Sequence, residues 1–233
     1  IDYIKHRSRP FIFSASIPPA NAAAAREALR ILKEEPERQK ALIDISNYMR
    51  ARLKEAGIPI IGTEPSCILT LRDEYLDLLP GDADAQAIAT QSFMIDEYLA
   101  KLDKEGTLGI TWSDETGPDV LFHGHCHQKA LVGMPPSMAI LKSAGCRATE
   151  SGAGCCGMAG SFGYEAEHYE VSKKIGEERL FPAVNNAGTQ TVVAIAGVSC
   201  RQQIEHFTER KTQHIAEVLA SRIRPGHVWQ APA

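Results

Sequence analysis

The sequence lacks any apolar run long enough to cross a bilayer, and it lacks an excess of positive charge. Its longest apolar stretches, such as Thr191–Val198, are much shorter than the roughly 20 residues that a transmembrane helix needs. The formal net charge of -4 gives no indication of nucleic acid or an anionic membrane as a partner. No signal-peptide pattern opens the chain, and its first residue is Ile1, which predicts a fragment or a trimmed product.

Cysteine is scarce and unevenly placed. The 233 residues include six cysteines, none of them before Cys67. A chain of this length, with 44% hydrophobic residues, buries a core without covalent cross-links, so we expect reduced thiols in the cytoplasm and no secreted disulfide framework. The paired C-x2-C spacings of zinc ribbons and the C-x2-C-x2-C-x3-C-P run of ferredoxins are also missing. Clustered thiols in a reducing compartment indicate metal or redox chemistry.

The first part of the chain, residues 1–63, contains no cysteine and reads as a helical segment. Residues 18–35 begin with proline and continue as an amphipathic helix. Residues 36–57 repeat apolar side chains at helical spacing and end at Gly57, a natural helix stop. Residues 58–62, "IPIIG", predict a short buried strand.

From residue 64 onward one unit repeats: an apolar strand, a loop of small residues with cysteine, and an amphipathic polar stretch. Strands that alternate with helices predict an α/β domain over residues 64–233, a parallel sheet with helices on both faces. In such a sheet the strand-to-helix loops open on one edge, where ligands bind. Five cysteines should therefore converge there: Cys67, Cys126, Cys155, Cys156 and Cys200.

Cys146 does not fit this pattern. It follows a predicted helix and precedes a strand, "SAGCRATE", so it should lie at the opposite edge of the sheet. We expect it to be a buried thiol that acts as a small hydrophobic residue.

Four or five thiolates around one cavity suit a soft metal centre, either zinc or an iron–sulfur cluster. The cysteines are scattered over several loops, and their single close pair is Cys155 and Cys156. Ligands that arrive from several directions favour a polynuclear centre. Cys126, Cys156 and Cys200 also lie near predicted helix starts, where the helix dipole stabilises a thiolate.

Other residues near these cysteines have more than one interpretation. Each histidine around Cys126 either ligates metal, donates a hydrogen bond to a sulfur, or is a polar loop residue. The glycine after the cysteine pair lets the backbone approach a cluster, and the arginine after Cys200 either neutralises cluster charge, binds an acidic substrate or is solvated. These neighbouring residues are His123, His125, His127, Gly157 and Arg201.

Residues 64–223 closely resemble the cysteine-rich CCG domain of iron–sulfur oxidoreductases. The matching phrases are "EPSCILTLRDEY", "LFHGHCHQKAL", "GCCGMAGSFGYEAEHYEVSKKIGEERLFPAV" and "GVSCRQQIEHFT". That family includes the iron–sulfur subunits of glycolate oxidase and anaerobic glycerol-3-phosphate dehydrogenase, the B subunit of heterodisulfide reductase, and C-terminal domains of FAD-linked oxidases. The resemblance implies a 4Fe-4S cluster on Cys126, Cys155, Cys156 and Cys200, with Cys67 as a further ligand.

The resemblance also implies partners. Electrons would come from FAD on a partner flavoprotein subunit or on a missing domain, which oxidises a 2-hydroxy acid such as glycolate or lactate. They would pass to a quinone or a thiol/disulfide carrier. Such a component would be cytoplasmic, attached peripherally to the inner membrane through its partners. The family pattern ends in C-x-x-C, but this chain has Gln203 at the last position, and it shows no flavin-binding region. We therefore expect an oxidoreductase component and not a complete enzyme.

The first part resembles a different family, the pyridoxal-phosphate (PLP) α-oxoamine synthases of the 8-amino-7-oxononanoate synthase type. The matching text is "YIKHRSRPFIFSASIPPANAAAAREALRIL" together with "MRARLKEAGIPIIGTEPS". The Schiff-base lysine of that family lies upstream of this match, so PLP is not expected as a cofactor. The two resemblances meet near Thr63, which predicts a chimera or misjoined gene. Two alternatives to the redox function stay open. One is a structural zinc or cluster-free interaction domain, and the other is a remnant of the synthase.

Overall fold

The computed structural model describes residues 19–224 and residue 226, and the chain divides into two compact units, Ile1–Glu55 and Ala56–Ala233. Residues 1–18, the start of the predicted helical segment, lie outside the described residues. So do residue 225 and residues 227–233.

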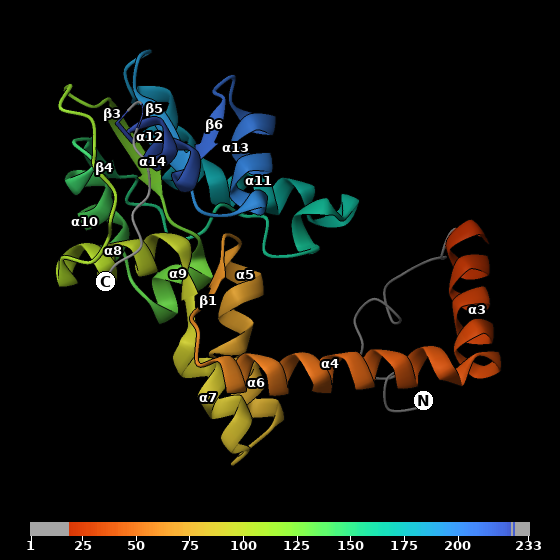
Figure 1. Cartoon of the computed structure of the whole chain (residues 1–233). Helices are drawn as coiled ribbons and strands as arrows, with labels where there is room; N and C mark the ends of the chain where they lie inside the picture. The colour runs from red at the N-terminus through yellow and green to blue at the C-terminus, as the bar shows by residue number, and fades with distance from the viewer. Residues whose placement is uncertain (1–18, 225, 227–233) are drawn as a thin grey trace. The chain divides into compact units, whose positions relative to one another are not determined.

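The described part of the first unit is helical. Helix α3 (Pro19–Glu34) begins with proline, and Arg30 stabilises its exposed face through ion pairs with Glu27 and Glu34. Helix α4 (Pro36–Ala56) is followed by Gly57, whose φ of 58° is the left-handed conformation that ends many helices. Both helices are drawn in red and orange in Figure 1.

The second unit contains two parallel sheets, which confirms the predicted α/β class. Strands β1 (Ile60–Gly62) and β2 (Ser92–Met94) pair with each other. The larger sheet, visible in Figure 1, has four strands that are all parallel to their neighbours. Their order across the sheet is β4 (Arg147–Glu150), β3 (Asp119–His123), β5 (Val192–Ile195) and β6 (Thr212–His214).

Helices fill the connections between these strands. Within the ranges that the structure describes, none of them combines the length and the apolar composition that a bilayer span needs. The α-helices of this unit are α5 (Pro65–Ile68), α6 (Glu74–Leu78), α7 (Ala83–Gln91), α8 (Ile95–Glu105), α9 (Cys126–Leu131), α10 (Pro135–Ser143), α11 (Tyr169–Glu178), α12 (Leu180–Asn186), α13 (Val198–Phe207) and α14 (Ile215–Ser221). Short 3-10 turns span Leu69–Leu71, Phe162–Tyr164 and Ala166–His168.

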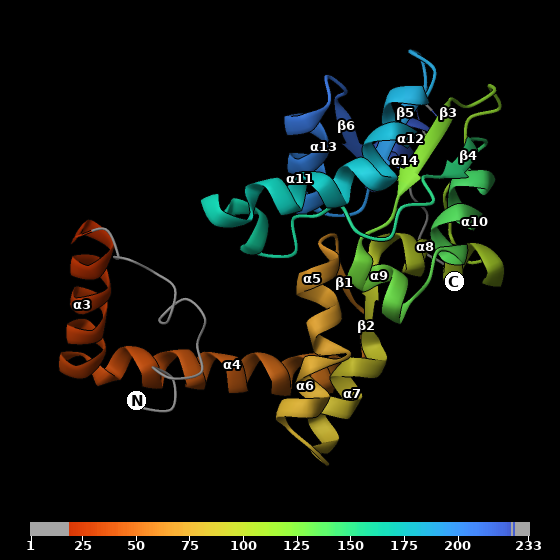
Figure 2. The same ribbon diagram turned by 180° about the vertical axis from the view of Figure 1, so that it is seen from behind.

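The central strands β3 and β5 of the four-stranded sheet are apolar on both faces, as strands between two helical layers require. Val120 and Phe122 point into one core, which they share with α10 and α14. Leu121 and Ile195 point into a second core, shared with α12 and α13. Figure 2 shows the face that carries α11, α12 and α13. The prediction of helices on both faces is therefore confirmed.

The strand order positions the functional site. From β3 the chain crosses to β4 on one side and later returns to β5 on the other side, so β3 and β5 are adjacent while their connections leave in opposite directions. This arrangement is a topological switch point, and ligands of open α/β sheets bind outside the carboxyl ends of the strands there. Strand β3 ends at His123, and strand β5 ends at Ile195.

The predicted buried strand at residues 58–62 is wrong in one respect. Strand β1 forms, but Ile61 is 47% exposed and Ile60 is half-buried. The reason is that β1 belongs to a two-stranded sheet with β2 alone, so its outer side is not covered by the larger sheet.

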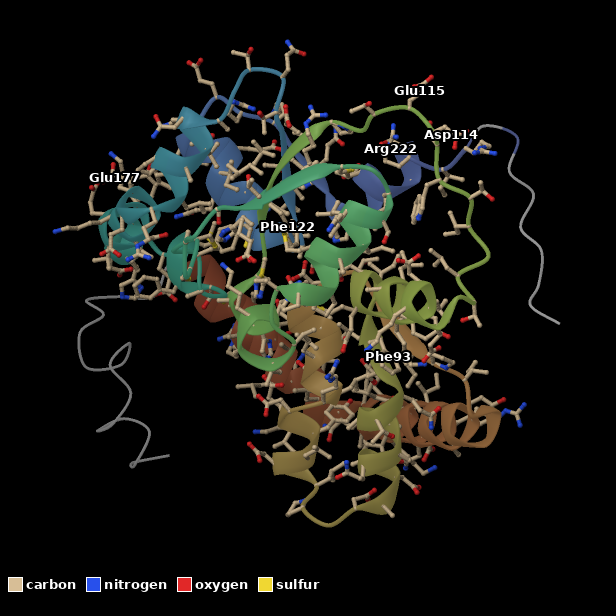
Figure 3. The ribbon with its side chains drawn as sticks, turned by 90° about the vertical axis from the view of Figure 1, so that its left-hand side faces the viewer. Phe93, Asp114, Glu115, Phe122, Glu177 and Arg222 are labelled. Atoms are coloured by element: carbon tan, nitrogen blue, oxygen red, sulfur yellow. The ribbon has the colours of Figure 1, made fainter. Side chains whose placement is uncertain are left out.

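Cys146 lies where the sequence placed it, immediately before β4 and buried at 6% exposure in the core. Arg222 closes the same end of the sheet, since its Nε donates to the Ala144 carbonyl at 3.0 Å. The Arg222 guanidinium also donates to the Glu115 carbonyl, and Figure 3 shows these two residues side by side. This edge is opposite to the carboxyl ends of the strands. Because Cys146 lies there and is buried, it is a core residue.

Candidate metal centre

The first thiol comes from the end of β3. The chain leaves the strand at His123, and His125 takes an extended backbone as the residue that caps α9. Its Nδ1 accepts a hydrogen bond from the His127 backbone N–H at 3.2 Å, which satisfies one of the free donors at a helix start. Cys126 is therefore fixed as the first residue of α9.

The next two thiols lie on the loop after β4. Gly157 has a φ of 98°, a conformation open to glycine but strained for other residues, and it turns the chain directly after Cys155 and Cys156. Its backbone N–H donates to the Cys155 Sγ at 3.3 Å. Lys129 holds the preceding part of the loop, since its Nζ donates to the Gly154 carbonyl at 3.1 Å.

Cys200 lies in the first turn of α13, which follows β5, and is 1% exposed. The thiols of Cys126, Cys155, Cys156 and Cys200 contact one another in that order. Three strand ends therefore bring together four of the five predicted cysteines, and all six cysteines of the chain are free thiols.

The four thiols divide into two donors and two acceptors. Hydrogen bonds from Cys126 and Cys156 lower the pKa of Cys155 to about 2. A hydrogen bond from Cys156 likewise holds the pKa of Cys200 well below its ordinary value. Donating these bonds, together with burial, raises the pKa of Cys126 and of Cys156. These bonds favour the thiolate at Cys155 and Cys200 and the thiol at Cys126 and Cys156, and a metal centre that uses all four sulfurs must displace the remaining protons.

The spacing of the sulfurs distinguishes between metal centres. In a tetrahedral zinc site with Zn–S bonds of about 2.3 Å, the sulfurs lie about 3.8 Å apart. Among the described residues, the group whose ligand atoms all lie within 4.8 Å of one another is Asp73, Glu74 and His127, not a set of cysteines. The four thiols thus leave more room than one zinc ion fills, which fits a centre with several metal atoms.

Cys67 and Arg201 differ in position from the four thiols. Cys67 is exposed on α5, which follows β1 in the smaller sheet. The Arg201 Nη2 pairs with the Glu217 Oε2 at 2.9 Å, so its guanidinium is directed to α14.

The three predicted histidines take different positions. His123 is 1% exposed and lies against the Cys200 thiol. His125 lies 4.0 Å from the Cys126 Sγ through its Nδ1, and its Nε2 is 3.3 Å from the Ser199 Oγ. The His127 Nε2 is about 4 Å from the carboxylates of Asp73 and Glu74.

Two polar residues at the site were not anticipated from the sequence. Lys129 lies one helical turn after Cys126. Burial lowers the pKa of its ammonium, and the charges of the four nearby thiols offset part of that shift. The sequence indicated this position only through the spacing, since residues three apart on a helix lie on the same face. Gln203, which occupies the position of the family's last cysteine, is buried and donates to the Ser172 carbonyl at 3.2 Å, tying α13 to α11.

A cavity of about 700 Å³ opens beside the thiols. Cys126 and Cys156 form part of its wall, with an apolar side made by small residues and Tyr164. Its lining is Glu64, Ser66, His125, Cys126, His127, Ala130, Cys156, Ala159, Gly160, Tyr164, Val198 and Ser199. The metal site is thus reached by solvent or ligands on the side of Cys126.

A buried polar network joins α9 to α10 and α8. The Gln128 Oε1 accepts from the His125 backbone N–H at 3.3 Å, and its Nε2 donates to the Ser137 Oγ at 2.7 Å. Ser137 in turn donates to the Asp96 carboxylate, which is 1% exposed. Burial raises the pKa of Asp96, although the bond from Ser137 opposes the shift.

This raised pKa predicts a pH-dependent stability. A carboxyl whose folded-state pKa lies above its unfolded-state value loses its stabilising contribution as the pH rises between the two. We expect the D96N variant, which carries no charge, to lack this decline and to be at least as stable as the wild type at neutral pH. Urea unfolding between about pH 4 and about pH 8 measures the difference.

Asp119→Asn is the matched control. Asp119 is exposed and its bond to Arg147 lowers its pKa, so its contribution is present at neutral pH and is lost as the pH falls. Both variants should resemble the wild type at low pH and differ from it at neutral pH in opposite directions, Asp96→Asn being at least as stable and Asp119→Asn less stable. Parallel curves for the wild type and Asp96→Asn would contradict the assignment.

Comparison with known proteins identifies two kinds of relative. The C subunit of anaerobic glycerol-3-phosphate dehydrogenase from Escherichia coli is 28% identical over 188 residues, which are 80% of this chain and 46% of that protein. D-2-hydroxyglutarate dehydrogenase of Escherichia coli is 30% identical over 176 residues, 74% of this chain and 16% of that protein. The chain therefore spans less than half the length of these relatives.

The beginning of the chain matches other proteins. The family described as aminotransferase class I and II matches residues 1–99. Serine palmitoyltransferase of Bacteroides thetaiotaomicron is 49% identical over 74 residues, 31% of this chain and 19% of that protein. No solved structure matches the chain. Both expected resemblances are confirmed. The chain begins with a segment homologous to class I and II aminotransferases. Its C-terminal region is homologous to D-2-hydroxyglutarate dehydrogenase and to the C subunit of anaerobic glycerol-3-phosphate dehydrogenase.

Proposed function

We propose that the chain binds an iron–sulfur cluster, of the 4Fe-4S type, and carries electrons as a component of an FAD-linked oxidoreductase. The observation that carries the proposal is the convergence of Cys126, Cys155, Cys156 and Cys200 from three strand ends at the switch point of the sheet. Four sulfurs complete the ligand set of such a cluster. The Gly157 N–H and the Lys129 ammonium supply the hydrogen bond and the positive charge that a negative cluster requires.

The flavin belongs to a partner in this proposal. One relative is named as a subunit of a dehydrogenase, so the flavin is placed on another subunit of a similar assembly. The names of the relatives contain a 2-hydroxy acid and a glycerol phosphate, but neither glycolate nor lactate. We therefore propose a small hydroxylated anion as the ultimate donor and leave glycolate out.

The acceptor is a quinone or a thiol/disulfide carrier that reaches the cluster through the cavity beside Cys126. A cytoplasmic chain, attached peripherally to the inner membrane by its partners, suits this role. The segment 1–63 stands outside the redox domain in this proposal, and PLP chemistry is not part of it.

Iron and acid-labile sulfide analysis tests the proposal on the full chain, purified and reconstituted without oxygen. We expect close to four iron and four sulfide per chain for a 4Fe-4S cluster, with a broad visible absorbance that dithionite bleaches. One zinc per chain without sulfide would support the structural zinc alternative. A PLP absorbance after addition of that cofactor would support the synthase remnant.

A further inference from the structure

His123 has a buried nitrogen with no protein partner. It is the last residue of β3, pairs with Ile195 of β5 in the sheet, and is 1% exposed. Its Nδ1 lies 2.9 Å from the Ser151 Oγ, whereas its Nε2 has no hydrogen-bond partner among the described residues. A buried polar group that makes no hydrogen bond destabilises the fold, so this position calls for a partner.

The His123 imidazole is close to two of the sulfurs. The imidazole lies against the Cys200 thiol, and this contact helps to lower the pKa of Cys200. It is also close enough to Cys155 to lower the pKa of that thiol. Since Nδ1 is occupied by Ser151, the nitrogen on the side of Cys200 is Nε2.

Ser151 can serve an imidazole that carries its proton on Nε2. A sulfur that ligates a metal has no proton to donate, so a hydrogen bond between it and the imidazole needs the proton on Nε2. The Ser151 hydroxyl, which accepts from the Ala153 backbone N–H at 3.4 Å, then donates to Nδ1. An imidazole that accepts at Nδ1 carries its hydrogen at Nε2. In this tautomer Nε2 is a donor and has no lone pair with which to ligate iron.

We propose that His123 donates a hydrogen bond from Nε2 to the Cys200 sulfur and thereby raises the reduction potential of the cluster. The inference rests on the proposed function, because it assigns one residue's effect on the cluster bound there. Reduction adds one electron to the cluster, and an N–H donor at a ligating sulfur stabilises the more negative, reduced form. His123 is a positioning residue in this role, since it acts through Cys200.

The test compares the reconstituted full chain with His123→Leu. We expect the variant to keep its cluster but to show a lower midpoint potential in a redox titration followed by electron paramagnetic resonance. Pulsed measurements in D2O should show an exchangeable proton coupled to the wild-type cluster and its loss in the variant. His123→Gln, which retains an N–H donor, should recover part of the shift. His206→Leu, at an exposed histidine on α13, should behave as the wild type.

Several outcomes overturn the inference. An unchanged potential in His123→Leu would do so, as would a strong nitrogen coupling in the wild type, which marks a direct ligand. If His123→Leu holds no cluster, Ser151→Ala serves instead, because it frees the tautomer and should shift the potential in the same direction by a smaller amount. A wild-type chain without any cluster would overturn the proposed function itself, and is recognised by its iron content.

Discussion

Replacing Cys200 with serine is expected to abolish the iron–sulfur cluster. Cys200 is 1% exposed in the first turn of α13, and the hydrogen bond from Cys156 holds its pKa well below the ordinary value, which favours the thiolate that a metal needs. Serine keeps the shape but offers a hydroxyl with little tendency to ionise. Changes beside a metal site already cost about 10–100-fold in affinity, and loss of a ligand should exceed that. Iron content and visible absorbance after anaerobic reconstitution measure the loss.

Cys155→Ser should have the same effect, because hydrogen bonds likewise favour the thiolate of Cys155. Cys67→Ser is the matched control. It removes a thiol that is exposed on α5 and does not line the cavity beside the site, so the variant should bind as much iron as the wild type. If Cys67→Ser lost the cluster and Cys200→Ser kept it, the four-thiol assignment would be wrong.

The sequence was sufficient to predict the convergence of the thiols, because that depends on topology alone. A strand that ends at His123 and another that ends at Ile195 must open on the same edge if both are parallel. The same argument placed Cys146 at the opposite edge, where it is buried. These conclusions need only the alternation of strands and helices.

The sequence did not predict in which direction a side chain points or which sheet a strand joins. Cys67 follows a strand as the other cysteines do, but β1 pairs with β2 in a separate sheet, which no pattern in the sequence shows. Arg201 follows Cys200 directly, yet one residue along a helix turns the side chain by about 100°, and it meets Glu217. The sequence likewise predicts an apolar face on α3, but Leu29 of that face is 58% exposed.

The second large effect is expected from Gly157→Ala. Gly157 has a φ of 98°, and a Cβ at this position would lie 2.2 Å from the Ser172 carbonyl oxygen of α11. A non-glycine residue in such a conformation costs about 1–3 kcal/mol, and the clash forces the loop or the helix to move. We expect a loss of at least about 3 kcal/mol in the free energy of unfolding without metal, measured by urea denaturation.

The cluster should be lost as well, because the Gly157 N–H bonds to the Cys155 Sγ and the turn sets the positions of both neighbouring thiols. Gly154→Ala in the same loop separates this effect from a general intolerance of alanine. A Cβ at Gly154 meets no atom within 4 Å and its φ is outside the left-handed range, so the change should stay within about 0.5 kcal/mol and retain iron. Equal losses in the two variants would mean that the loop as a whole, and not the turn at Gly157, holds the thiols in place.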